Sequence, residues 1–222
     1  FLYHGYSADR DQVLDLAGGL CARGYEVVLM ELRGHGSRPG PCTLGVREAE
    51  EAGVVLRWAA SREPSSSVLP VGVLGFSMGG AVACQAAFRY PEIRAVVMDS
   101  VYPRFFPVLA QAIRKRYHLP VFPWAVVTWW SLQLAIGRRL SSVDPVALAS
   151  RMVIPLFAVQ GGGDRRVSPK LAQELYRQWA GPKEQWFEPG VAHVQMFARH
   201  PREYGDRVAA FFDRALARAP TS

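Results

Sequence analysis

The stretch GFSMGG, Gly75 to Gly80, decides how this sequence folds. It closes an apolar run, PVGVLGF, that predicts a buried strand, and it opens an alanine-rich run, AVACQAAF, that predicts a helix. A sharp turn between the two forces Ser77 into strained backbone angles, and the flanking glycines let neighbouring chain pass close by. The pattern therefore predicts a serine hydroxyl presented at a helix N-terminus, where N–H groups favour negative charge. A tight glycine turn with an incidental serine is the alternative.

Strand and helix patterns alternate along the whole chain, which is typical of a parallel α/β sheet. Most of the apolar runs are continuous, as expected for strands covered on both faces. The predicted strands are Phe1–His4, Glu26–Leu32, Val71–Phe76, Ala95–Asp99, Ile154–Gln160 and Gln185–Glu188. The predicted helices are Asp11–Arg23, Val46–Arg62, Met78–Tyr90, Pro169–Ala180 and Pro201–Ala217.

One segment, residues 100–152, interrupts the alternation. It has no clear strand and is rich in aromatic residues and prolines, and a structureless loop of that length is rare in a compact domain. We therefore predict a helical insertion within one domain spanning residues 1–222. Leu119–Gly137 is uncharged, but Pro120 and Pro123 interrupt it, so we expect a buried or lid helix rather than a membrane span.

Bulk composition restricts the function classes. The formal charge is +7, but the basic residues form no block longer than Arg114–Arg116, so nucleic-acid binding is not predicted. The three cysteines, an odd number without metal-ligand spacing, favour a reducing compartment such as the cytoplasm. The chain starts inside an apolar strand, so we expect no signal peptide and a true N-terminus upstream of residue 1.

The motif Gly75-Phe76-Ser77-Met78-Gly79 has the pattern G-x-S-x-G in a strand-to-helix context, and here the chain resembles the α/β-hydrolase superfamily over nearly its whole length. The resemblance is greatest to the esterase, acylglycerol-lipase and serine-aminopeptidase branch. It implies an α/β-hydrolase fold with a mostly parallel sheet flanked by helices and a helical cap, and it makes Ser77 the nucleophile. A serine there, rather than aspartate or cysteine, implies acyl chemistry.

The same resemblance implies the two partners of the serine. GGGDRRVSP, after the fifth predicted strand, matches the family's acid loop at Asp164, and EPGVAHVQMF, after the last strand, matches its histidine loop at His193. A serine hydroxyl needs an imidazole to accept its proton, and that imidazole needs a carboxylate to fix its tautomer. Asp99 also ends a strand and is the rival acid.

The resemblance further implies an oxyanion hole made by the backbone N–H groups of Met78 and of Tyr6, which follows a His4-Gly5 pair. His4 and His35 are predicted to be structural, His118 and His200 to be solvated or capping, and Asp144 to cap the helix that begins at the next residue. Gly34-x-Gly36 could be mistaken for a dinucleotide fingerprint, but Pro39 replaces its third glycine and no helix follows.

Two departures from the family pattern stand out. The match begins at the family's third strand, so we expect Glu26–Leu32 to form a sheet edge that missing residues or a partner must cover. Gln160 stands where many relatives have histidine, at a position that is not catalytic.

We predict a serine hydrolase of carboxylic esters that needs neither metal nor organic cofactor and acts on a small-molecule substrate. Apolar side chains of the insertion suggest a pocket for short or medium acyl chains: Phe105, Phe106, Trp124, Trp129 and Trp130. The alternative use of these aromatics is to pack the insertion onto the core. Amide or C–C bond hydrolysis by the same residues, and ligand binding without catalysis, remain alternative functions.

Overall fold

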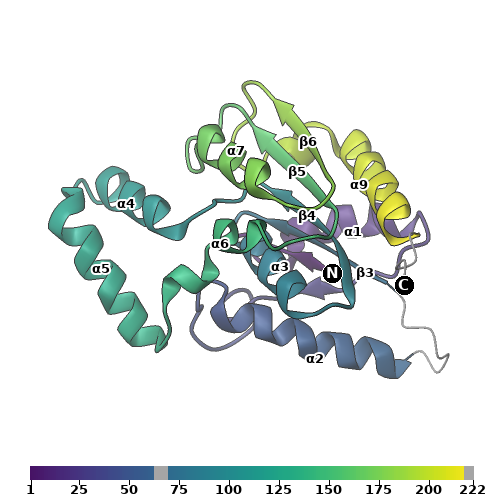
Figure 1. Ribbon diagram of the computed structural model, residues 1–222, viewed down its shortest axis with the longest axis horizontal. Coiled ribbons are helices and arrows are strands. Elements are labelled where there is room, and N and C mark those ends of the chain that lie inside the picture. Colours follow the sequence, from purple (N-terminus) through teal and green to yellow (C-terminus); the bar gives the residue numbers. More distant parts are fainter. Residues whose placement is uncertain (63–69, 218–222) are drawn as a thin grey trace.

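The computed structural model describes residues 1–62 and 70–217 (Figure 1). Six parallel strands form one sheet in the order β2-β1-β3-β4-β5-β6. Their bounds are β1 Leu2–Tyr3, β2 Leu29–Met30, β3 Val71–Phe76, β4 Ile93–Asp99, β5 Leu156–Gly161 and β6 Lys183–Glu188. The long central strands are almost entirely buried because helices cover both of their faces.

Helices cover the sheet on both sides. One apolar core joins the sheet to α2, α3, α6 and α7, and a second joins it to α1, α8 and α9. The helices of the first face are α2 Val46–Arg62, α3 Met78–Arg89, α6 Pro145–Ala149 and α7 Pro169–Gln178. Those of the second are α1 Leu14–Cys21, α8 Met196–Arg199 and α9 Pro201–Leu216, with a short 3-10 turn, η1 Arg10–Val13, before α1. This arrangement is the predicted α/β fold.

The turn from β3 to α3 depends on glycine for steric reasons. A Cβ atom on Gly79 would lie 2.4 Å from the carbonyl oxygen of His4 and 2.6 Å from that of Tyr3. A Cβ on Gly75 would lie 2.2 Å from the backbone of Gly79. The missing side chain of Gly79 therefore lets β1 pass directly over the first turn of α3, and that of Gly75 lets the same turn pack against the end of β3.

Two glycine-to-alanine substitutions are expected to change stability in opposite directions. A Cβ atom on Gly18, in α1, would meet nothing within 4 Å, so Gly18→Ala should raise the free energy of unfolding by about 0.5–1 kcal/mol through helix propensity. Gly79 is also helical, but Gly79→Ala should lower that free energy by at least about 2 kcal/mol because backbone atoms must move. Urea unfolding of the two variants measures the difference, and equal effects would contradict the steric argument.

The insertion (residues 100–152) is helical. It contains α4 Phe105–Arg116, α5 Val121–Ile136, a 3-10 turn, η2 Leu140–Val143, and α6. Helices α4 and α5 pack against each other and extend away from the sheet to one side (Figure 1). The segment leaves the sheet at the carboxyl end of β4, which is the edge where Ser77 also lies, because β3 and β4 are parallel neighbours.

One local prediction is wrong, and another is confirmed only in part. The strand predicted over Glu26–Leu32 is reduced to β2, since only Leu29 and Met30 find partners on the two-residue strand β1. Asp144 takes the N-cap position of α6 with its backbone, but its side chain accepts a hydrogen bond from Phe105 N at 2.8 Å and so caps α4. The reason is that Arg104, the N-cap residue of α4, offers no side-chain acceptor.

Among the described helices, none is both long enough and apolar enough to cross a membrane.

Candidate active site

Ser77 occupies the turn between β3 and α3 in a strained conformation. Its φ is 51° and its ψ is −113°, values that a non-glycine residue rarely adopts. Its backbone N–H donates to Asp99 O at 2.8 Å, which ties the turn to the end of β4. The hydroxyl is thereby held at the N-terminus of α3, where backbone N–H groups point at any negative charge that develops beside it.

His193 lies between Ser77 and Asp164. Its Nε2 atom is 3.0 Å from Ser77 Oγ, and its Nδ1 atom is 2.7 Å from Asp164 Oδ2. With a proton on Nδ1 donated to the carboxylate, Nε2 presents a lone pair to the serine hydroxyl. The structure thus brings together three side chains that are 87 and 29 positions apart in the chain, within the distances that proton transfer requires.

The carboxylate of Asp164 is held in its charged form. Burial pushes its pKa upward, but hydrogen bonds from His193 and from the backbone N–H groups of Val167 and Arg166 outweigh burial and lower the pKa below its ordinary value. Both backbone N–H groups donate to Oδ1 at 2.8 Å, which leaves Oδ2 for the imidazole. Gln160 Nε2 adds a longer contact to Oδ2 at 3.3 Å. A permanently anionic group in this place can stabilise an imidazolium.

The rival acid, Asp99, has other partners. Its Oδ1 accepts from Ser100 Oγ at 2.8 Å and its Oδ2 accepts from Tyr204 OH at 3.0 Å. Complete burial raises the pKa of Asp99 to about 6, against the opposing effect of these hydrogen bonds. A carboxyl that protonates near pH 6 and whose oxygens are already engaged is a poorer partner for His193 than Asp164 is.

Of the two N–H groups predicted for the oxyanion hole, one belongs to the residue after Ser77 and the other to the loop that passes beside Ser77 at Gly5. Met78 N is the first amide of α3. Gly5, the residue before Tyr6, lies so close that a Cβ on it would be 3.7 Å from Ser77 Cβ. In the described part of the chain neither Met78 N–H nor Tyr6 N–H donates to another group, so both remain available to an oxyanion.

The loop that carries Tyr6 is braced by side chains. Buried His4 accepts from Leu32 N through Nε2 at 3.0 Å and donates from Nδ1 to the carbonyl of Gly5 at 2.8 Å. Burial lowers the pKa of His4, which keeps it in the neutral form that this pair of bonds needs. Gln12 Oε1 accepts from Gly5 N at 2.7 Å. His4 therefore supports the loop, while the contribution of Gln12 had no recognisable signal in the sequence.

Residues that the sequence did not single out hold the histidine loop in place. Ser100 Oγ accepts from Val194 N at 3.1 Å while it donates to Asp99. Ser100 has a φ of 56° and Val194 a φ of 53°, and positive φ is a strained conformation, above all for a β-branched residue. Backbone strain is therefore concentrated next to His193 as well as at Ser77. The sequence held one signal for the role of Ser100, its position directly after a strand-ending aspartate. It held none for Tyr204, which donates to Asp99.

The other histidines lie elsewhere. His35 Nδ1 is 2.9 Å from Arg33 O and the ring packs against those of His4 and Tyr6. His200 precedes α9 and its Nε2 lies 2.7 Å from Glu188 Oε2. His118 is exposed in the turn between α4 and α5.

The insertion contacts the acid loop directly. Gln111, in α4, donates to the carbonyl oxygen of Arg165, and Arg104 forms a 2.7 Å ion pair with Glu174 of α7. These contacts place α4 beside the loop that carries Asp164.

The five aromatic residues predicted for an acyl pocket separate into two groups. Phe105 and Phe106 pack on Trp129, with ring centroids 6.3 and 5.3 Å apart, inside the α4–α5 contact. Trp124 and Trp130 are exposed on α5. Three of the five therefore pack inside the insertion, and of these three Phe105 also packs against the main core, as the packing alternative predicted.

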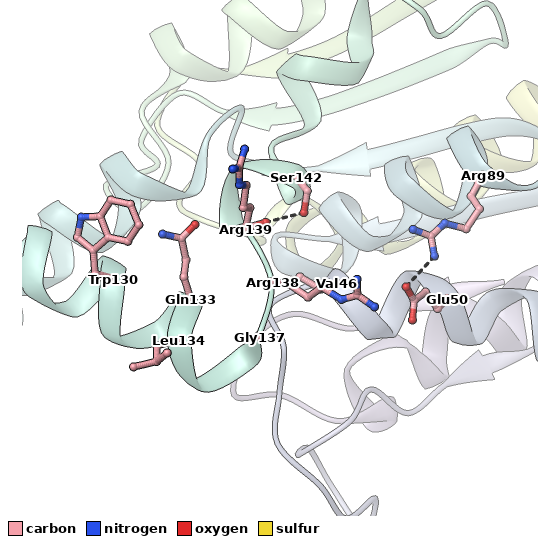
Figure 2. Close-up of a pocket in the computed structure, with 10 residues that line it drawn as sticks. All are labelled: Val46, Glu50, Arg89, Trp130, Gln133, Leu134, Gly137, Arg138, Arg139 and Ser142. Atoms are coloured by element: carbon pink, nitrogen blue, oxygen red, sulfur yellow. Dashed lines mark hydrogen bonds and ion pairs between the residues drawn. The ribbon is translucent and has the colours of Figure 1, made fainter.

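A cavity of about 700 Å³ lies between α5, the segment after it, and helices α2 and α3. Figure 2 shows Trp130, Gln133 and Leu134 on the α5 side and Glu50, paired with Arg89, on the other. The lining includes neither Ser77 nor His193, so this cavity is separate from the site at the carboxyl edge of the sheet.

Comparison with known proteins now decides the family. A family model described as "Alpha/beta hydrolase family" matches residues 1–210. The chain belongs to the alpha/beta hydrolase family.

Individual relatives resemble the chain at low sequence identity. Uncharacterized protein YqkD of Bacillus subtilis is 24% identical over 193 residues, which cover 86% of this chain and 63% of YqkD. Uncharacterized protein Rv2307c of Mycobacterium tuberculosis is 28% identical over 86% of this chain and 60% of its own length. The chain thus spans about three fifths of these two relatives. A pimeloyl-[acyl-carrier protein] methyl ester esterase of Neisseria meningitidis is 24% identical, covering 94% of this chain and 93% of that protein.

Solved structures give the same family. The Pyrococcus furiosus esterase Pf2001 superposes with a TM-score of 0.75 at 26% identity, covering 97% of this chain and 82% of that one. A monoacylglycerol lipase of Paleococcus ferrophilus has a TM-score of 0.70 at 19% identity, covering 96% and 93% of the two chains, and this likeness concerns the fold alone.

Proposed function

We propose that this alpha/beta hydrolase cleaves carboxylic esters through a Ser77–His193–Asp164 triad and an acyl-enzyme intermediate. The observation that carries the proposal is the continuous hydrogen-bonded series from Ser77 Oγ to His193 Nε2 and from His193 Nδ1 to Asp164 Oδ2. The names of the Neisseria esterase and of the Pyrococcus esterase support an ester as the substrate.

In the first half of the reaction Ser77 Oγ attacks the ester carbonyl carbon while His193 Nε2 accepts the hydroxyl proton. The carbonyl oxygen becomes an oxyanion that accepts hydrogen bonds from Met78 N and Tyr6 N, each worth about 3 kcal/mol of transition-state stabilisation. The imidazolium formed on His193 is stabilised by the anionic Asp164. His193 then donates its proton to the alcohol oxygen, the carbon–oxygen bond breaks, and the acyl group stays on Ser77.

In the second half a water molecule replaces the alcohol. His193 Nε2 accepts a proton from the water as its oxygen attacks the acyl carbon, and a second oxyanion forms in the same two-donor site. Collapse of that intermediate returns the proton to Ser77 Oγ and releases the carboxylic acid. The two strained segments at Ser77 and Val194 serve to hold nucleophile and base in this geometry throughout the cycle.

The substrate is proposed to be an apolar ester of short or medium acyl chain. The adjacent insertion contributes apolar side chains of α4, the helix that lies beside the acid loop, and no acidic residue precedes Asp144 in the insertion. Burial of an acyl chain against such a surface is favourable by about 0.8 kcal/mol for each methylene.

A graded substrate panel tests the proposal. We expect p-nitrophenyl acetate, butyrate, octanoate and laurate to be hydrolysed, with kcat/KM highest for the butyrate or the octanoate. Aminoacyl p-nitroanilides should be turned over far more slowly, since the amine is a poorer leaving group. Higher kcat/KM on the anilides would point to amide hydrolysis instead, and absence of turnover on both series, without phosphonylation of Ser77 by a fluorophosphonate, would indicate a binding protein.

A further inference from the structure

Helix α5 exposes an unusually apolar surface. Nine of the sixteen large hydrophobic side chains that are exposed in the described residues lie between positions 117 and 134. Phe122 is 78% exposed, Trp130 is 66% exposed and Leu134 is 85% exposed. Exposed apolar patches of this kind on a globular protein mark interaction sites.

The exposed residues form a face of α5 opposite its packed side. Ala125 is buried and, with the partly buried Trp129 and Leu132, packs on α4. Val127, Trp130 and Leu134 follow one another at helical spacing on the outer side. No residue of α5 is charged, and its polar residues are Thr128, Ser131 and Gln133. We call the side chains of Phe122, Trp124, Val126, Val127, Trp130 and Leu134 the apolar face.

Basic residues stand at both ends of this face. Arg114, Lys115 and Arg116 end α4, just before α5, and Arg138 with Arg139 follow α5 after Gly137. Residues 101–143 contain six arginines and lysines and no aspartate or glutamate, so the insertion carries nearly all of the +7 formal charge. Of the six, only Arg104 forms an ion pair among the described residues. The other five are free to meet an external anion.

We propose that α5 docks on the surface of an anionic phospholipid bilayer, with the apolar face in the acyl boundary and the five cations on the headgroups. α5 is apolar on both sides: one side packs on α4, and the other is exposed. An exposed apolar side that carries tryptophan and is flanked by arginine and lysine suits the membrane interface. The backbone of α5 is non-helical at Phe122, and the regular helix that follows, residues 123–136, spans about 21 Å, too short to cross a bilayer but long enough to lie along it.

The charges also argue against the other occupant of such a face, a second copy of this chain. Two α5 helices packed face to face would bring five cations of each copy close to those of the other, which is unfavourable. A lipid surface rich in phosphatidylglycerol supplies the opposite charge, and each cation near it adds to binding. The cavity in Figure 2 is lined by Arg138 and Arg139 as well as by Trp130 and Leu134, so cationic and apolar side chains border the same hollow next to the apolar face.

Flotation with vesicles tests the proposal independently of catalysis. The Ser77→Ala protein is mixed with vesicles of phosphatidylcholine alone or of equal parts phosphatidylcholine and phosphatidylglycerol. We expect it to float with the anionic vesicles, weakly or not at all with the neutral ones, and several-fold less at high salt. Because this background cannot turn over ester, failure of binding would not reflect the hydrolase proposal, and a failed ester panel would not bear on binding.

Two pairs of substitutions separate the apolar and the charged contributions. Trp130→Ser with Leu134→Ser should lower the partition coefficient on anionic vesicles at least about tenfold. Arg138→Gln with Arg139→Gln should lower it about tenfold, with no change on neutral vesicles. The matched control substitutions lie on other surfaces of the protein. Neither Trp58→Ser on α2 nor the pair Arg57→Gln with Arg202→Gln should change the partition coefficient on anionic vesicles.

Three outcomes would overturn the proposal: no flotation with anionic vesicles, unchanged flotation of both the Trp130–Leu134 and the Arg138–Arg139 variants, or equal losses in the matched controls. Light scattering adds a fourth. A dimer in solution that the Trp130 and Leu134 substitutions dissociate, without vesicle binding, would assign the apolar face to self-association.

Discussion

Ser77→Ala is expected to lower kcat for ester hydrolysis by about 10⁵-fold or more, since removal of Oγ leaves no nucleophile within reach of His193. The hydroxyl is presented by a strained turn whose shape depends on glycines and on a hydrogen bond from Ser77 N to Asp99 O, and alanine can keep both. The variant should therefore fold, and its loss of activity should be chemical. The measurement is turnover of p-nitrophenyl butyrate together with the urea unfolding midpoint.

A covalent probe gives the same prediction a second readout. A fluorophosphonate should phosphonylate Ser77 Oγ of the unaltered protein, with loss of fluoride, and leave the Ser77→Ala variant unlabelled. Ser61→Ala, on the exposed end of α2, is the matched control and should keep both activity and labelling. Labelling of the Ser77→Ala protein, or activity within tenfold of normal, would show that another residue is the nucleophile.

Asp164→Asn is expected to lower kcat about 10³–10⁴-fold. An asparagine there can present an N–H to His193 Nδ1, which favours the tautomer with its proton on Nε2, pointing at Ser77 Oγ instead of accepting from it. It also removes the anion that would stabilise the imidazolium. The backbone N–H groups of Arg166 and Val167 can still donate to the amide oxygen, so the loop should keep its conformation.

Asp99→Asn is the matched comparison, an isosteric change in another buried carboxyl near the same loop. Its oxygens accept from Ser100 and Tyr204, so its substitution should act only through the position of the Val194 backbone and cost about tenfold or less. Measuring kcat of both variants on the same ester decides which of the two aspartates is the acid. A larger loss in Asp99→Asn than in Asp164→Asn would transfer the acid role to Asp99.

Much of the fold could be predicted because local patterns and tertiary packing agree. The predicted bounds of α2 and β3 match the structure. The amphipathic spacing of α2 indicates a helix, and the continuous apolar run of β3 indicates a buried strand. β2 is shorter than predicted because strand length depends on the partner strand, and β1 offers only two residues. The side chain of Asp144 caps α4, a helix that begins 39 residues earlier, for which no local pattern exists.

The amino-acid sequence alone determined the order of strands and helices, the glycine-flanked serine turn, and which loops would carry a carboxylate and an imidazole. These features depend on residues only a few positions apart, so the spacing of apolar side chains and the positions of glycines indicate them. Only the tertiary structure decided that Asp164 rather than Asp99 meets His193, that Ser100 and Tyr204 support the site, and which of the apolar side chains of α5 stay exposed. Those outcomes depend on contacts between distant segments, whose distances are set by how whole helices pack on the sheet.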